Sequence, residues 1–113
     1  MTAYDEAKGT DNRLWGFRFP NEDGTPAVDD MMFEKMAELG STKGCFAGHD
    51  HMNNFSVMKD GIRLTYGLSD DHNIYLTPLR GGILINIKND GSFTTQHLIR
   101  HRGQSTITIG KEQ

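Results

Sequence analysis

The first regular pattern of apolar positions along the chain is that of a helix. It predicts a helix over about residues 31–39, in which apolar side chains recur at helical spacing: Met32, Met36 and Leu39. Gly40 is expected to end this helix, and Asp29 or Asp30 to cap its first free N–H groups. The methionine-rich stripe is interpreted as a face that packs against the protein core.

Strand-like patterns follow the helix. A short apolar run at residues 44–47 predicts a buried strand, and its cysteine, Cys45, is expected to be a buried, inert thiol. Two hairpins are predicted further on, because an Asp-Gly pair separates two strand-like runs in each: residues 55–58 with 62–66, and 82–88 with 92–99. A last short strand is expected within residues 105–109.

The N-terminal segment has a different composition, since charged and turn-forming residues dominate it. Residues 1–28 are therefore expected to be poorly ordered, with a possible short strand where Trp15, Phe17 and Phe19 alternate. The rest of the chain, residues 29–113, is expected to form one unit. The pattern predicts an α/β protein of α+β content, in which one main helix precedes mostly antiparallel strands.

Charge and hydropathy limit the classes of partner. The chain has 12 basic and 15 acidic residues, a net charge of −3, which favours neither nucleic acid nor an anionic membrane as a partner. The longest apolar run is too short to cross a bilayer, and the polar N-terminus is unlike a signal peptide. A cytoplasmic chain is expected, with export of a longer parent left open.

The candidate chemistry lies directly after the first predicted strand. His49 and His51 are two residues apart, so both imidazoles can reach one small volume, and neutral imidazole binds zinc, iron or manganese. Asp50, between them, could orient either ring by a hydrogen bond. His72, in a polar loop, is a third candidate, and its alternative reading is a solvated side chain. His97 is interpreted as a packed or sheet-edge histidine.

The surroundings of this pair resemble a known family. The residues from Cys45 to Phe55 read Cys-Phe-Ala-Gly-His-Asp-His-Met-Asn-Asn-Phe, and those from Asp60 to Gly67 read Asp-Gly-Ile-Arg-Leu-Thr-Tyr-Gly. Together with the strand that begins at Arg80, they resemble the C-terminal part of calcineurin-like metallophosphoesterases, in the purple-acid-phosphatase-like branch. Asn54 departs from the family pattern, which has aspartate at that position.

The resemblance implies a fold and a site. Residues 29–113 would be the C-terminal half of a partial αββα metallophosphoesterase sandwich. His49 and His51 would each bind one of two metals (Fe, Mn or Zn) that bind a phosphate ester and activate a hydroxide for attack on phosphorus. Asp50, Asn53 and His72 would lie around the metals or beside the substrate. The family's other ligand motifs are absent from this sequence, so the isolated chain is expected to be inactive.

Three other readings stay open at the level of sequence. The chain could be a non-catalytic binding or self-assembling module that forms homo-oligomers through exposed sheet edges. It could be a small metal-binding protein that uses His49, His51 and His72. Both histidines of the pair could instead be structural, with hydrogen bonds to their own loop.

Overall fold

The computed structural model describes residues 3–18, 31–70, 80–100 and 107–109, which contain two helices and seven strands arranged in two sheets. The helices are α1 (Ala3–Ala7) and α2 (Met32–Leu39). The strands, in chain order, are β1 (Arg13–Phe17), β2 (Gly44–Ala47), β3 (Asn54–Lys59), β4 (Ile62–Tyr66), β5 (Arg80–Ile87), β6 (Phe93–Arg100) and β7 (Ile107–Ile109). This mixed content, with mostly antiparallel strands, confirms the expected α+β class.

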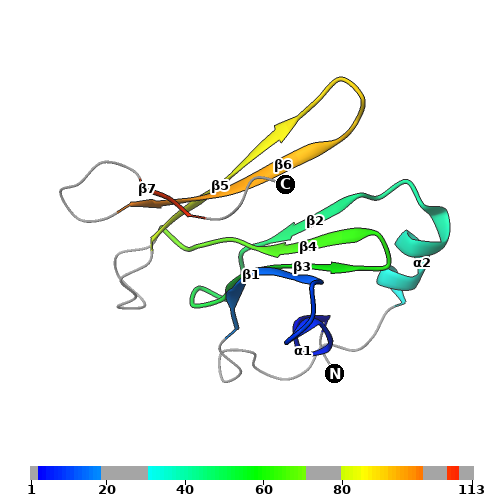
Figure 1. The fold of residues 1–113 in the computed structure, drawn as a ribbon, viewed down its shortest axis with the longest axis horizontal. Coiled ribbons are helices and arrows are strands. Elements are labelled where there is room, and N and C mark those ends of the chain that lie inside the picture. The colour runs from blue at the N-terminus through cyan, green and yellow to red at the C-terminus, as the bar shows by residue number, and fades with distance from the viewer. Residues whose placement is uncertain (1–2, 19–30, 71–79, 101–106, 110–113) are drawn as a thin grey trace.

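The larger sheet has the strand order β1-β3-β4-β2, and β2 is the one strand in it that runs parallel to its neighbour. Strands β3 and β4 form the first predicted hairpin, and β1 pairs with β3. The β3–β4 turn holds Asp60 and Gly61 at φ values of 47° and 76°, the left-handed backbone that a two-residue hairpin turn requires. The smaller sheet has the order β5-β6-β7 and contains the second predicted hairpin. Figure 1 shows it as a separate layer.

The apolar core lies on one face of the larger sheet, beneath helix α1. Tyr4 and Ala7 of the helix are buried against Val57 of β3, and Phe55 and Leu64 pack around them. The rings of Tyr4 and Phe55 are 5.0 Å apart between centroids. Helix α1 was not predicted from the sequence, because five residues are too few to show helical periodicity.

The other face of the larger sheet is polar although it is buried. Ser56 of β3 and Thr65 of β4 are opposite each other and share a hydrogen bond of 2.9 Å. The smaller sheet also contributes to this layer. Every second residue of β6 lies on the same face, which carries Phe93, Thr95 and His97, and two ring contacts join the sheets. These contacts are Phe46 with Phe93, and Trp15 with His97, at centroid distances of 6.1 Å and 3.6 Å.

Two predictions about burial are wrong. Strand β2 is the outer strand of its sheet and is mostly exposed, and Cys45 on it is an exposed thiol. An apolar run predicts a strand, but only the neighbouring elements decide whether a strand is covered. The apolar stripe of Met32, Met36 and Leu39 was predicted to pack against the core, and this is also wrong. None of the residues of α2 is buried, and Met32 and Leu39 are 61% and 68% exposed.

The helix α2 begins and ends close to the predicted positions. Met31 is the N-cap residue and makes no side-chain cap, whereas the predicted caps, Asp29 and Asp30, lie outside the described residues. Gly40 ends the helix in the left-handed conformation, as predicted, and its N–H donates to the Met36 carbonyl. No helix in the described residues is long and apolar enough to cross a membrane.

Candidate functional site

The histidine pair lies on the connection between β2 and β3, which we call the histidine turn (residues 48–53). Because β2 is parallel to β4, the turn leaves the sheet at the edge where β4 also ends. The amide of Gly67, just after β4, donates to the Ala47 carbonyl at the end of β2 over 2.8 Å. The start of the histidine turn is therefore fixed to the sheet by backbone hydrogen bonds.

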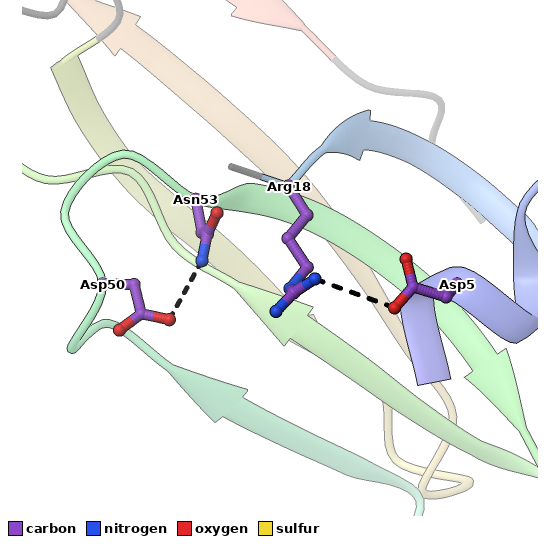
Figure 2. Close-up of polar contacts among 4 residues, drawn as sticks. All are labelled: Asp5, Arg18, Asp50 and Asn53. Atoms are coloured by element: carbon purple, nitrogen blue, oxygen red, sulfur yellow. Dashed lines mark hydrogen bonds and ion pairs between the residues drawn. The ribbon is translucent and has the colours of Figure 1, made fainter. Parts of the chain in front are cut away.

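Asp50 and Asn53 close the turn. The Asn53 side-chain amide donates to Asp50 Oδ2 over 2.9 Å (Figure 2). The Asn53 backbone N–H donates to the Asp50 carbonyl over 3.2 Å. Asn53 is 1% exposed, so its side chain is held inside the molecule while it makes this bond. A buried amide with a carboxylate acceptor is a strong local constraint. The pair thus gives the turn one defined shape.

The two histidines differ in exposure within this shape. His49 is exposed, whereas His51 is half-buried, and both follow β2 at the same edge of the sheet. His72, the third predicted candidate, lies outside the described residues. Among the residues that the structure describes, no group of three His, Cys, Asp or Glu side chains is placed to hold a metal ion. The turn therefore offers two imidazoles, fewer than a closed metal site requires.

Arg18 is a cation at this edge that no motif in the sequence indicates. It follows β1, and because Phe17 pairs with Asn54, it comes beside the end of the histidine turn. Its guanidinium lies 3.7 Å from the carboxylate of Asp5 on α1, and its side chain is 15% exposed (Figure 2). No local motif could reveal it, since the pairing of β1 with β3 joins distant parts of the chain.

His97 does not belong to this group. It lies on β6, is 0% exposed and packs its ring against Trp15, which confirms the prediction of a packed histidine. The pKa of His97 is lowered to about 4, mainly by burial and to a smaller extent by the charge of Arg63, although the nearby Tyr66 backbone carbonyl acts to raise it. Neither ring nitrogen makes a hydrogen bond of good geometry within the described residues, although that carbonyl lies close enough to act. The ring is neutral near pH 7.

The arrangement defines a class of site: a tight turn after a sheet strand that presents an exposed and a half-buried imidazole, with a cation at the same edge.

Comparison with known proteins adds one relative. Over 42 residues, 37% of this chain, the sequence is 43% identical to a protein of Arabidopsis thaliana named probable inactive purple acid phosphatase 14. The match covers 10% of that protein, so the chain spans about a tenth of its length.

No protein-family model matches the chain, and no solved structure matches it. The partial match supports a phosphatase-like relationship for part of the chain.

Proposed function

We propose that this chain is the C-terminal part of a metal-dependent phosphoesterase-like domain, and that its histidine turn supplies two of the metal ligands. The observation that supports it best is the shape of the turn. Hydrogen bonds from Asn53 to Asp50 hold His49 and His51 at the end of a sheet strand. Such strand ends are where ligands enter layered folds.

The donor set fits a metal only in part. His49 and His51 are the right kind of ligand for zinc, iron or manganese, but one imidazole for each metal binds weakly. We propose that the remaining ligands come from protein segments other than the described residues. A bound metal pair would polarise a phosphate ester, while Asp50 and Asn53 keep the turn in shape.

Metal binding at the turn can be measured without any activity. Manganese(II) broadens the NMR signals of imidazoles close to it, so we expect the ring protons of His49 and His51 to broaden at lower metal concentration than those of His97. The buried His97 ring is the internal control, since it lies on the other sheet. His49→Ala should weaken the effect on His51, whereas Asn86→Ala, at an exposed position of β5, should not. Equal broadening of His49, His51 and His97 would contradict the proposal.

The proposal also predicts the activity of the chain. Alone, with manganese, it should hydrolyse p-nitrophenyl phosphate no faster than the metal does without protein, because two imidazoles cannot hold a metal pair. Turnover above that background that His49→Ala abolishes, and that Asn86→Ala leaves intact, would show that the chain assembles a complete site by itself.

A second candidate function is that of a non-catalytic, self-assembling module. The outer strand β5 favours it, because Leu84, Ile85 and Ile87 are exposed along that strand. Exposed apolar strands at a sheet edge are surfaces that a second chain can cover.

A further inference from the structure

Strand β2 (Gly44–Ala47) has an open edge. It is the outer strand of the larger sheet, and no strand pairs with its far side among the residues that the structure describes. Proteins usually protect such an edge with charged residues, proline or a bulge. The sequence of β2 is Gly-Cys-Phe-Ala, which supplies none of these, and every residue after the glycine is exposed. The edge is therefore suited to pairing with another strand.

The backbone of β2 presents fixed hydrogen-bonding groups at this edge. The Arg63 N–H donates to the Lys43 carbonyl over 3.0 Å, so that carbonyl points toward β4. Backbone groups alternate in direction along a strand, and those of Cys45 therefore also point toward β4. The N–H and C=O groups of Gly44 and Phe46 point the other way, to the open edge.

A second copy of β2 matches these groups in one antiparallel register. A two-fold axis perpendicular to the sheet, placed at Cys45, sets Gly44 of each chain opposite Phe46 of the other. Residues opposite each other in this way exchange both of their N–H···O bonds, so the outward groups of both residues gain partners. Cys45 then lies opposite its own copy, with the two Cα atoms about 4.5 Å apart. A disulfide spans Cα separations of about 4.4–6.8 Å, so this register allows one.

The charges that flank β2 favour this antiparallel arrangement. Lys43 precedes the strand, and Asp50 is the first carboxylate after it. An antiparallel copy brings the Lys43 end of one chain beside the Asp50 end of the other, whereas a parallel copy would bring like charges together. No charged residue lies within β2, so the strand does not repel its own copy.

Strand β5 offers apolar cover for an added strand. Ile85 and Ile87 are opposite Thr95 and Phe93 of β6, so they share the face that meets the larger sheet. They are 38% and 77% exposed, although the Phe93 ring reaches Phe46 of β2. Figure 1 shows the β5–β6 hairpin on the side of β2 away from β4. A strand added to β2 extends the larger sheet toward these exposed side chains.

We propose that β2 is the interface of a homodimer, in which two copies of the strand pair in antiparallel register about a two-fold axis at Cys45. The proposal identifies the surface that a self-assembling module would use. It does not rest on metal binding at the histidine turn, so either proposal can fail without the other.

Crosslinking of the native chain tests the register, because Cys45 is the single cysteine and is exposed. Copper phenanthroline catalyses the reaction in which dissolved oxygen takes two electrons and two protons from a pair of thiols. At micromolar chain concentration, Cys45 should form a disulfide-linked dimer, seen on a non-reducing gel. A chain that stays uncrosslinked would overturn the proposal.

The double variant Cys45→Ser/Ala47→Cys is the matched control. It moves the thiol to another exposed position of β2 on the same face. In the proposed register the two copies of position 47 are about 13 Å apart along the strands, so this variant should remain uncrosslinked. In denaturing urea the two thiol positions should react at the same slow rate. Equal crosslinking of the two folded chains would overturn the register.

The mass of a charged variant tests the interface itself. Cys45→Lys sets two like charges opposite each other and should shift the mass in sedimentation from dimer to monomer, once circular dichroism confirms that the variant folds. Leu39→Lys adds the same charge at an exposed position of α2 and should keep the dimer. A dimer that survives Cys45→Lys but dissociates in Ile87→Lys would place the contact on β5 and overturn the proposal.

Discussion

At the scale of single residues, the most informative side chains are polar ones in the layer between the two sheets. Arg63 and His97 are buried there, where an apolar residue would be expected. The sequence does not mark Arg63 as buried, because this residue alternates with apolar residues as an exposed strand residue would. His97 was predicted to be packed, but its contact with Trp15 depends on how the sheets meet.

The burial of His97 predicts how stability depends on pH. The pKa of His97 is about 4 in the folded chain and 6.5 when unperturbed, so between these values the unfolded chain binds a proton that the folded chain excludes. The stabilisation is therefore fully present above pH 6.5 and is lost as the pH falls toward 4. The free energy of unfolding should fall by about 2 kcal/mol between about pH 7 and about pH 5 from this group.

Urea unfolding at the two pH values measures this effect, and Trp15, the chain's single tryptophan, gives a fluorescence signal beside the ring. His97→Leu should remove most of the pH dependence. His49→Gln, which replaces an exposed histidine, should keep it. A slope that survives in His97→Leu would show that another group titrates.

At the scale of elements, the local hairpins and the longer-range strand pairings have different origins. The β3–β4 and β5–β6 hairpins each follow from an Asp-Gly pair between strand-like runs, and both were predicted. The pairing of β1 with β3 was not predicted. It requires Gly16, whose φ of 85° and close approach to the Asn54 carbonyl leave no room for a side chain.

Replacement of Gly16 therefore tests the β1–β3 pairing. In Gly16→Ala the new methyl group would meet the Asn54 carbonyl oxygen, and the backbone would be strained at positive φ. The free energy of unfolding should fall by about 2 kcal/mol or more, measured by urea denaturation. Gly82→Ala is the matched control, since a methyl group there meets open space at an ordinary φ. Equal effects of the two variants would contradict this account of Gly16.

At the scale of the whole molecule, the chain leaves much apolar surface without cover in the described residues. The exposed fraction of Ile87 is 77%, that of Leu84 41% and that of Ile85 38%, all on β5, which is the outer strand of the smaller sheet. The outer strand β2 of the larger sheet is also mostly exposed. We propose that a second copy of the chain pairs with one of these outer strands.

Light scattering at micromolar concentration tests this self-association. The chain should have the mass of a dimer or a larger oligomer, and Ile87→Lys should shift it toward the monomer, because a charge on an apolar contact strand opposes pairing. Asn86→Lys adds the same charge at a neighbouring exposed position whose side chain alternates to the other face, and should have a smaller effect. A monomeric mass for the unchanged chain would contradict the proposal.

The sequence by itself determined the local elements. Helix α2 ends at Gly40, and two hairpins form around their Asp-Gly turns, because these features depend on neighbouring residues and on the φ values that glycine permits. It also identified the histidine turn, whose residues are adjacent in the chain.

Only the tertiary structure decided what is covered. It left Cys45 and the stripe of α2 exposed, buried Arg63 and His97, and brought Arg18 beside the histidine turn. Burial depends on which distant segment packs on which face. An apolar pattern indicates that a face can be covered, but it does not identify the segment that covers it.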